Sequence, residues 1–324
     1  MGLALGETCQ FGYLNLGMFV KNVSSGISPD YPLIEKATRL MTRVLDNALE
    51  ISLARYAHPA NDYIMRAKRK IGIGICGFAD FLIQLGIPYQ SIAAREAATD
   101  VLTFINYVSK LESYELAKAR GSFLAMNMAC GSRYDDTPGF LEKKYGNLNA
   151  RSVSNAAWIE LNYRIKRNRL LRNASTTALP PTGRSGLVVD ASTGIEPLFS
   201  LVDYSGAINK YFEKDLRQKG LVRQEILKKI MAIGRSGDIS QVPLNLRFIY
   251  QTALEIPPES HLAMTVAAQR AVDESVSKTI NLPAKSSSRD VFDIYANAYD
   301  MGLKGITIFR TGSRSIQPRK VATL

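Results

Sequence analysis

The stretch Lys70–Asp80, KIGIGICGFAD, carries the pattern G-x-G-x-x-G in Gly72, Gly74 and Gly77 and runs directly into an apolar helical segment. A dinucleotide-binding loop needs a strand before the glycines, a helix after them and an acidic residue about 20 positions further on, at the end of a second strand. The first two features are present. After Gly77, however, the chain passes through a turn into another long helix, so no second strand supplies the acid. The pattern therefore favours tight packing between a strand and a helix over a dinucleotide site.

Strand and helix patterns alternate along the rest of the chain. Short β-branched or alternating runs predict strands at Ile71–Ile75, Ala174–Leu179, Lys278–Asn281 and Gly305–Phe309. Apolar residues at helical spacing predict helices at Tyr31–Tyr56, Phe78–Leu85, Glu96–Arg120, Ser154–Lys166, Ile226–Met231, Ser260–Ser275 and Ser288–Asp300. Gly121 is expected to end the third of these helices. Strands that alternate with helices run parallel, so the sequence predicts an α/β architecture.

The composition indicates a folded protein with a basic surface. The chain has 324 residues, 46% of them hydrophobic, and carries 41 Lys and Arg against 29 Asp and Glu, a formal charge of +12. This charge suits nucleotides, nucleic acid or an acidic partner, and it also suits an ordinary solvated surface. The densest basic cluster, Arg164–Arg172 (RIKRNRLLR), is short and has no interleaved aromatic residues. That argues against nucleic acid as a partner.

The cysteines and histidines form no metal-binding motif. Cys9, Cys76 and Cys130 lack C-x-x-C spacing, and His58 and His261 lie far from them in the sequence. We therefore expect no metal site and a reducing compartment. Cys76 is expected to be a buried core residue and Cys130 a surface thiol. Both histidines are expected to be structural.

The sequence shows neither a secretory signal nor a membrane span. The N-terminus lacks the charged region and apolar core of a signal peptide. The longest apolar run, Ile71–Ile87, is broken by Asp80 and Gln84. We expect a cytoplasmic protein with no membrane partner.

A second glycine-rich region, Asn173–Pro197 (NASTTALPPTGRSGLVVDASTGIEP), has the composition of a phosphate site. Two prolines are followed by Thr182, Gly183, Arg184, Ser185 and Gly186. Their backbone N–H groups, two hydroxyls and one guanidinium could surround an anion. The region is not a Walker loop, because it contains no G-x-x-x-x-G-K. From the pattern alone, a tight turn between two strands is favoured over an anion site.

Several segments, in order, resemble the large subunit of ribonucleotide reductases. The family pattern APTG followed by SSGIEPLF is similar to PPTGRSG (180–186) and ASTGIEPLF (191–199), and ETCQFGYLNLG (7–17) resembles the family's CNLGSINL. Further similar segments are VLDNALE, RKIGIGICGFADFLIQLGIPY, SYELAKARGSF, LRNAS, ESHLAMTVAAQRAVDESVSKTINLP and AYDMGLKGITIFRTGSR. The resemblance runs to about Gln317. SKTINLP and KGITIFRTGSR make the chain most similar to the adenosylcobalamin-dependent, class II enzymes.

The resemblance implies a fold, a domain organisation and an activity. Family members contain a ten-stranded α/β barrel built from two five-stranded halves. This chain is similar to the C-terminal half, with five parallel strands and their helices in residues 1–317 and a short basic tail in 318–324. The family reduces ribonucleoside di- or triphosphates to deoxyribonucleotides for DNA synthesis. A thiyl radical on a finger loop removes the 3′ hydrogen, a carboxylate assists loss of the 2′ hydroxyl, and a cysteine pair supplies two electrons.

The resemblance also implies roles for individual residues. Cys9 matches one cysteine of the redox-active disulfide, which a thiol reductant such as thioredoxin or glutaredoxin restores. Residues 182–186 match the loop that binds the substrate diphosphate, although Arg184, Ser185 and Gly186 replace the usual Thr-Ile-Ser. Thr307 and Ile308 align with two tyrosines that relay a radical from a second subunit in class I enzymes. Without phenol side chains that relay cannot run, and the cofactor implied is adenosylcobalamin.

Other functional parts of the family have no counterpart in the sequence. The finger loop, Asn-Pro-Cys-Gly-Glu, would lie just before Cys9, where only Met1–Thr8 stand, and the chain ends in QPRKVATL without the C-x-x-C of many relatives. We therefore expect the C-terminal half of a split reductase, or a fragment of one. It should be inactive without a partner chain that carries the thiyl-radical cysteine, because a half barrel exposes strand edges and an apolar interior. The alternative is an inactive remnant that binds nucleotide or nucleic acid.

Overall fold

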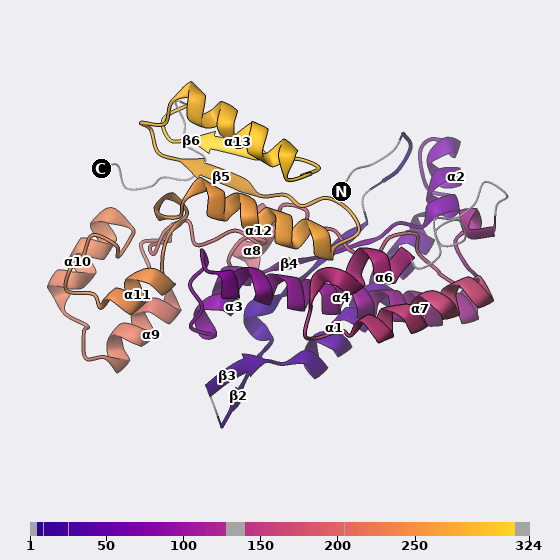
Figure 1. Ribbon diagram of the computed structural model, residues 1–324, viewed down its shortest axis with the longest axis horizontal. Coiled ribbons are helices and arrows are strands. Elements are labelled where there is room, and N and C mark those ends of the chain that lie inside the picture. The colour runs from indigo at the N-terminus through magenta and orange to yellow at the C-terminus, as the bar shows by residue number, and fades with distance from the viewer. Residues whose placement is uncertain (1–4, 9, 25, 128–139, 204, 315–324) are drawn as a thin grey trace.

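The computed structural model describes residues 5–8, 10–24, 26–127, 140–203 and 205–314, which form short strands and more numerous helices (Figure 1). The strands are β1 (Phe11–Asn15), β2 (Val20–Val23), β3 (Gly26–Pro29), β4 (Gly72–Cys76), β5 (Thr279–Leu282) and β6 (Thr307–Arg310). The α-helices are α1 (Tyr31–Ser52), α2 (Pro59–Lys68), α3 (Phe78–Gln84), α4 (Ile92–Arg120), α6 (Phe140–Tyr145), α7 (Asn155–Asn168), α8 (Gly183–Val188), α9 (Lys210–Gln218), α10 (Gln224–Ile233), α11 (Leu244–Ile249), α12 (Pro258–Ala271) and α13 (Ser288–Asp300). The 3-10 helices are η1 (Leu16–Met18), η2 (Leu124–Asn127), η3 (Gly146–Leu148) and η4 (Ala253–Glu255).

Five parallel segments, adjacent in chain order, form the centre of the fold. β1 pairs with β4 in a register that sets Phe11 opposite Gly72. On its other side β4 bonds to segment 174–179, which bonds in turn to residues 274–277. Those residues lead into β5, and β5 pairs in parallel with β6. The predicted α/β fold with five parallel strands is confirmed. The strands that the structure describes form an open array and not a closed barrel.

Gly74 in β4 and Gly77 just after it let neighbouring segments approach closely. The strand is buried along its whole length. A Cβ added at Gly74 would lie 3.1 Å from the carbonyl oxygen of Ala178, and one added at Gly77, where φ is +68°, would clash with Oδ1 of Asn15. These contacts correct the sequence interpretation in one respect. Gly74 and Gly77 are required by β1 and segment 174–180 rather than by the packing of a helix on a strand.

Helices cover this array and extend it at both ends. α1 and α4 pack against each other beside β1 and β4, and α12 packs on α4 and β5 (Figure 1). α1 buries Ile34, Leu45 and Leu49 in this central core. Two smaller cores lie at opposite ends of the molecule in Figure 1, one among α9, α10 and α11 and the other around Trp158 on α7. A third small core, with Leu262, Ile280 and Ile294, lies among α12, β5 and α13, so the described residues form one central core and three smaller ones.

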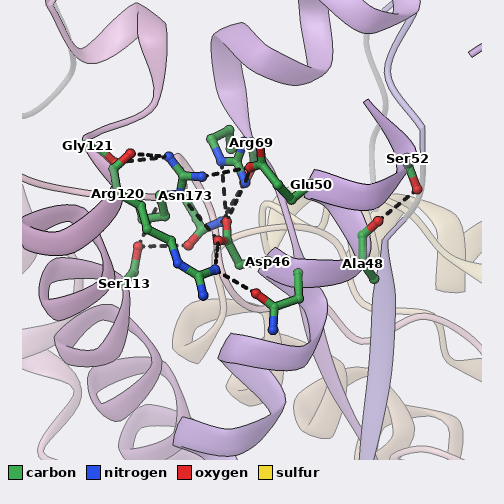
Figure 2. Close-up of polar contacts among 11 residues, drawn as sticks. Asp46, Ala48, Glu50, Ser52, Arg69, Ser113, Arg120, Gly121 and Asn173 are labelled. Carbon is green, nitrogen blue, oxygen red and sulfur yellow. Dashed lines mark hydrogen bonds and ion pairs between the residues drawn. The ribbon is translucent and has the colours of Figure 1, made fainter. Parts of the chain in front are cut away.

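A buried ionic cluster holds the amino ends of two neighbouring strands together (Figure 2). Asp46 on α1 is fully buried and accepts hydrogen bonds from Arg69 at 2.8 Å, from Arg172 at 3.3 Å and from Asn173 at 3.2 Å. Arg69 lies just before β4, and Arg172 and Asn173 lie just before segment 174–179. Burial alone would raise the pKa of Asp46, but the guanidinium groups of Arg69 and Arg172 outweigh it and hold that pKa below its usual value.

A second buried ion pair, between Asp273 and Lys110, holds segment 174–179 on the side that faces residues 274–277. Both carboxylate oxygens of Asp273 lie 2.7 Å from Nζ of Lys110 on α4. Asp273 also accepts the backbone N–H groups of Thr176 at 2.8 Å and of Thr177 at 3.2 Å. Burial opposes ionisation, but the two lysines Lys110 and Lys144 lower the pKa of Asp273 far below its usual value. Segment 174–179 is thus held by two separate carboxylates.

Most of the predicted elements are present, with shifted ends. The helix predicted to end at Gly121 does so, with φ of +76° at that glycine. The helix predicted over Ser260–Ser275 instead ends at Ala271, because Asp273 turns into its ion pair and Ser275 joins the parallel array. β1, the β2–β3 hairpin and the helices α2, α6, α8, α9 and α11 were not predicted. Residues 318–324 and the predicted boundary at 317 lie outside the described residues.

We expect replacement of Asp46 by Asn to destabilise the fold by about 3–5 kcal/mol, because it leaves buried guanidinium groups without their counter-charge. The carboxylate has a lowered pKa in the folded state, so its contribution is present above the unfolded pKa of about 3.9 and is lost as the pH falls below that value. Urea unfolding of the wild type and of Asp46→Asn at pH 7 and pH 3 measures both effects. Asp62→Asn, at an exposed ion pair with Arg66, is the matched control. An equal loss in both variants would contradict the role of Asp46.

Candidate functional site

A pocket of about 340 Å³ opens at the carboxyl end of the parallel array, away from the Asp46 cluster. Two loop pieces, 181–183 and 193–199, form one wall, and β5 and β6 form another. The described lining residues are Pro181, Thr182, Gly183, Thr193, Gly194, Glu196, Pro197, Phe199, Ala253, Ser277, Thr279, Asn281, Thr307, Ile308, Phe309 and Arg314. Its volume falls within the roughly 300–1,000 Å³ usual for small-molecule sites. In open α/β sheets, ligands bind at this end of the strands.

The predicted phosphate loop lies at this pocket in part. Thr182 and Gly183 line it, whereas Ser185 is exposed and Gly186 packs against the chain, where an added Cβ would come within 3.0 Å of the Ala191 carbonyl oxygen. The structure describes only the backbone of Arg184. The interpretation of 180–186 as a turn between two strands is wrong: helix α8 begins at Gly183, and the Thr182 carbonyl accepts from the Ser185 N–H at 2.7 Å.

Thr182 has an unused hydrogen-bonding group beside the pocket. Its residue is 2% exposed, and among the described residues its hydroxyl has no hydrogen-bond partner. A buried hydroxyl without a partner costs about 1–3 kcal/mol. Gly194, with φ of +51°, lies so close that an added Cβ would be 3.7 Å from Thr182 Oγ1. This part of the pocket wall thus combines small residues with a hydroxyl that has no partner among the described residues.

The two loops are held on the array by contacts that also exclude a dinucleotide at the first glycine motif. Ser192 accepts the N–H of Gly77 at 2.7 Å through its carbonyl, and its own N–H donates to Asp80 at 2.6 Å. The N-terminus of α3, where a pyrophosphate would bind in a dinucleotide fold, is therefore occupied by the chain itself. Tyr13 on β1 donates to the Pro181 carbonyl at 2.8 Å. β1 and α3 thus position the pocket loops.

Sequence reasoning missed an ion pair in the pocket wall. Glu196 lies 2.6 Å from Nζ of Lys278, whose side chain is fully buried, and also accepts the Thr279 N–H at 2.6 Å. Behind it, His261 lies 2.9 Å from the same Nζ. Both charged residues belong to segments noted for their resemblance, SKTINLP and TGIEPLF. The resemblance was therefore the one signal that could have identified them.

The remaining cysteines and histidines have structural surroundings where they are described. Cys76 is a free, buried thiol, and burial followed by the nearby charge of Asp80 raises its pKa to about 11. His58 caps α2, accepting the Ala60 N–H at 3.2 Å. Burial and Lys278 lower the pKa of His261 to about 3. Cys9 and Cys130 lie outside the described residues, so the predicted role of Cys9 stays a prediction.

The described residues contain neither a metal-binding cluster nor a membrane-spanning helix. No three His, Cys, Asp or Glu side chains among them gather closely enough to hold a metal ion. None of the described helices is long and apolar enough to cross a membrane.

Comparison with known proteins gives consistent matches. The family described as ribonucleotide reductase, barrel domain, matches residues 5–309. A vitamin B12-dependent ribonucleoside-diphosphate reductase of Mycobacterium tuberculosis (strain CDC 1551 / Oshkosh) is 31% identical over 318 residues, covering 96% of this chain and 40% of that protein. One of Thermoplasma acidophilum is 30% identical over 321 residues, covering 96% of this chain and 36% of that protein. The chain thus spans about 40% of the length of the first of these relatives.

A solved structure supports the fold independently of sequence. The class Id ribonucleotide reductase alpha subunit of Actinobacillus ureae matches with a TM-score of 0.70 at 20% identity, over 94% of this chain and 50% of that one. The parallel array and the match over residues 5–309 therefore lead to one conclusion: this chain belongs to the ribonucleotide reductase family and forms part of its barrel domain.

Proposed function

We propose that this chain is the C-terminal part of the barrel domain of a ribonucleotide reductase and binds a ribonucleoside di- or triphosphate in the pocket at the carboxyl end of its strands. The observation that carries the proposal is the buried Thr182 hydroxyl, which has no partner among the described residues and lies in the loop predicted to bind the diphosphate. In the proposed complex this hydroxyl donates to a phosphate oxygen, and Gly183 and Gly194 leave space for it. Arg314 on the opposite wall adds positive charge.

The radical source is proposed from the pocket wall formed by β6. Thr307 and Ile308, the positions aligned with the tyrosine relay, both line the pocket and have no phenol. These side chains suit a cofactor that acts in place, and the relatives named above are vitamin B12-dependent. When bound, adenosylcobalamin would supply the radical that starts the reaction. A pocket of about 340 Å³ is of nucleotide size and too small for a corrin ring, so in this proposal the pocket residues bind substrate and not the cofactor.

The redox role of Cys9 is proposed from its position in the sequence. It precedes β1 by two residues, and Tyr13 on β1 contacts the loop that forms the pocket. In the proposed reaction the Cys9 thiol and a second cysteine close a disulfide as they deliver two electrons, and a thiol reductant such as thioredoxin or glutaredoxin reopens it. The second cysteine and the thiyl-radical cysteine would come from the rest of the reductase.

The unpaired edge of the strand array supports the proposal that this chain works together with the rest of the reductase. Among the described residues, β1 pairs with β4 alone, and Phe11 on it is 43% exposed. Beside this edge α1 exposes an apolar stripe at intervals of seven, four and seven residues: Leu33, Leu40, Val44 and Ile51. Met41, on the flank between the stripe and the buried face, lies against Gly12 of β1. The exposed stripe thus lies on the helix that packs against the edge strand, as expected where a strand and a helix of the rest of the reductase would pack.

Thr182→Val should weaken nucleotide binding without unfolding the protein. Valine has the same shape and removes only a hydroxyl that has no partner, so stability should hold while affinity for a ribonucleoside diphosphate falls roughly tenfold or more. Isothermal titration calorimetry at low salt measures the affinity. The matched control is Thr38→Val, since Thr38 on α1 has the same kind of buried, unpartnered hydroxyl far from the pocket. Equal affinity in the two variants would refute the diphosphate contact.

Cys9→Ser should abolish a disulfide between this chain and the part of the reductase that carries Asn-Pro-Cys-Gly-Glu. Non-reducing electrophoresis of the purified pair, without added reductant, shows the crosslink in the wild type. Cys76→Ser is the control, because that buried thiol should not take part. A crosslink that survives Cys9→Ser would exclude the proposed role. An inactive remnant would bind nucleotide but, when mixed with the other part and adenosylcobalamin, would yield no deoxyribonucleotide.

Val44→Asp should weaken the association of the two parts by about tenfold or more, because it places an unpaired charge in the proposed contact. The control is Met231→Asp on α10, which makes the same kind of change at a residue that is 54% exposed and lies beside the core of α9, α10 and α11. It should leave the association intact. Analytical ultracentrifugation of the mixed parts measures both. Unchanged association of Val44→Asp would show that α1 does not form the contact.

A further inference from the structure

Glu196 is an acidic residue in a pocket proposed to bind an anion. Among the described lining residues it is the only acid, and its side chain is 20% exposed. A carboxylate repels a phosphate group, so its place in this wall calls for a reason. Two features explain it: the charge of Glu196 is paired with Lys278, and its carboxylate oxygens can still accept hydrogen bonds from a ligand.

The hydrogen-bond partners of Lys278 identify it as a charged ammonium. Its Nζ lies 2.6 Å from Glu196 Oε2, 2.9 Å from His261 Nδ1 and 3.4 Å from the Thr279 carbonyl oxygen. His261 Nε2 lies 3.0 Å from the Ala253 carbonyl, which can only accept, so Nε2 carries the proton and Nδ1 is an acceptor. Burial lowers the pKa of Lys278 and Glu196 opposes that shift. Three acceptors for three ammonium hydrogens make this a buried ion pair.

The Glu196 carboxylate, which lines the pocket, can still accept further hydrogen bonds. Oε2 accepts from Lys278 and Oε1 accepts the Thr279 N–H, both at 2.6 Å. Each carboxylate oxygen has a second lone pair, so up to two further hydrogens can be accepted. The protein-side bonds hold the carboxylate in one orientation, and the Lys278 charge balances its own. Glu196 is therefore a fixed acceptor that a neutral O–H group of a ligand can use.

We propose that Glu196 contacts the ligand and accepts a hydrogen bond from a ribose hydroxyl of the bound nucleotide. This inference rests on the proposed function, since it takes the ligand to be a ribonucleotide. Thr182 and Gly183 then receive the phosphate end, and Glu196, two residues beyond Gly194 in the same wall, receives the sugar. The site would select for a hydroxyl-bearing sugar, because a ligand without hydroxyls leaves the fixed acceptor unpaired.

The test compares two ligands of equal charge, a ribonucleoside 5′-diphosphate and its 2′,3′-dideoxy analogue, by calorimetry on the full chain. The wild type should bind the ribonucleotide roughly tenfold more tightly than the analogue, and Glu196→Gln should bring that ratio close to one. Glu213→Gln, an exposed carboxylate on α9, should keep the wild-type ratio. Because Glu196→Gln leaves Lys278 unpaired, the double variant Glu196→Gln with Lys278→Met repeats the test without a buried lone charge.

The ratio of the two affinities decides whether Glu196 contacts the ribose. A ratio that falls in Glu196→Gln and in the double variant supports the contact. If both ligands weaken by the same factor, Glu196 only positions the loop and the inference is wrong. It is also wrong if the wild type binds both ligands equally, a result that leaves the nucleotide pocket itself intact. If neither ligand nor inorganic pyrophosphate binds, the proposed function fails together with the inference.

Discussion

Segment 174–179 depends on buried carboxylates, and the pocket depends on that segment. Asp46 holds the residues just before it, and Asp273 holds the N–H groups of Thr176 and Thr177. Each carboxylate is ionised because arginines or lysines lower its pKa against the effect of burial. A charge buried without these partners would cost several kcal/mol, so the segment has one favourable position. Its carboxyl end leads directly through Pro180 to Thr182, and the pocket loop takes its position from charges at the far end of the strand.

Regular, strongly patterned elements could be predicted from the sequence, and irregular ones could not. α1, α4 and β4 have long apolar faces or a continuous apolar run, so their periodicity identifies them. β1 is half-exposed and gives no such run, and α8 begins at a glycine amid small residues that also suit a turn. In the site, Thr182 and Gly183 were predicted through the family resemblance. Glu196 and Lys278 are 82 residues apart, and only the fold brings them together.

The open strand array agrees with the fact that this chain matches only part of its relatives. The relatives are more than twice as long as this chain, and the solved alpha subunit matches it over half of its own length. In the described residues, one outer strand carries the exposed Phe11 and the other, β6, contributes Thr307 and Ile308 to the pocket wall. The pocket and the free strand edge thus lie on one framework. Under the proposed function, the parts that complete the barrel would also enclose the nucleotide.

The burial of Cys76 has a consequence for chemistry that depends on sulfur. With a pKa of about 11, this thiol is ionised in only about one molecule in ten thousand at neutral pH. Thiolate is the form that attacks disulfides and reacts with oxidants. Cys76 is therefore expected to be unreactive, although it lies on a central strand. If the proposed radical and disulfide chemistry takes place on this chain, the sulfur atom of Cys76 can lie in the interior without diverting electrons from it.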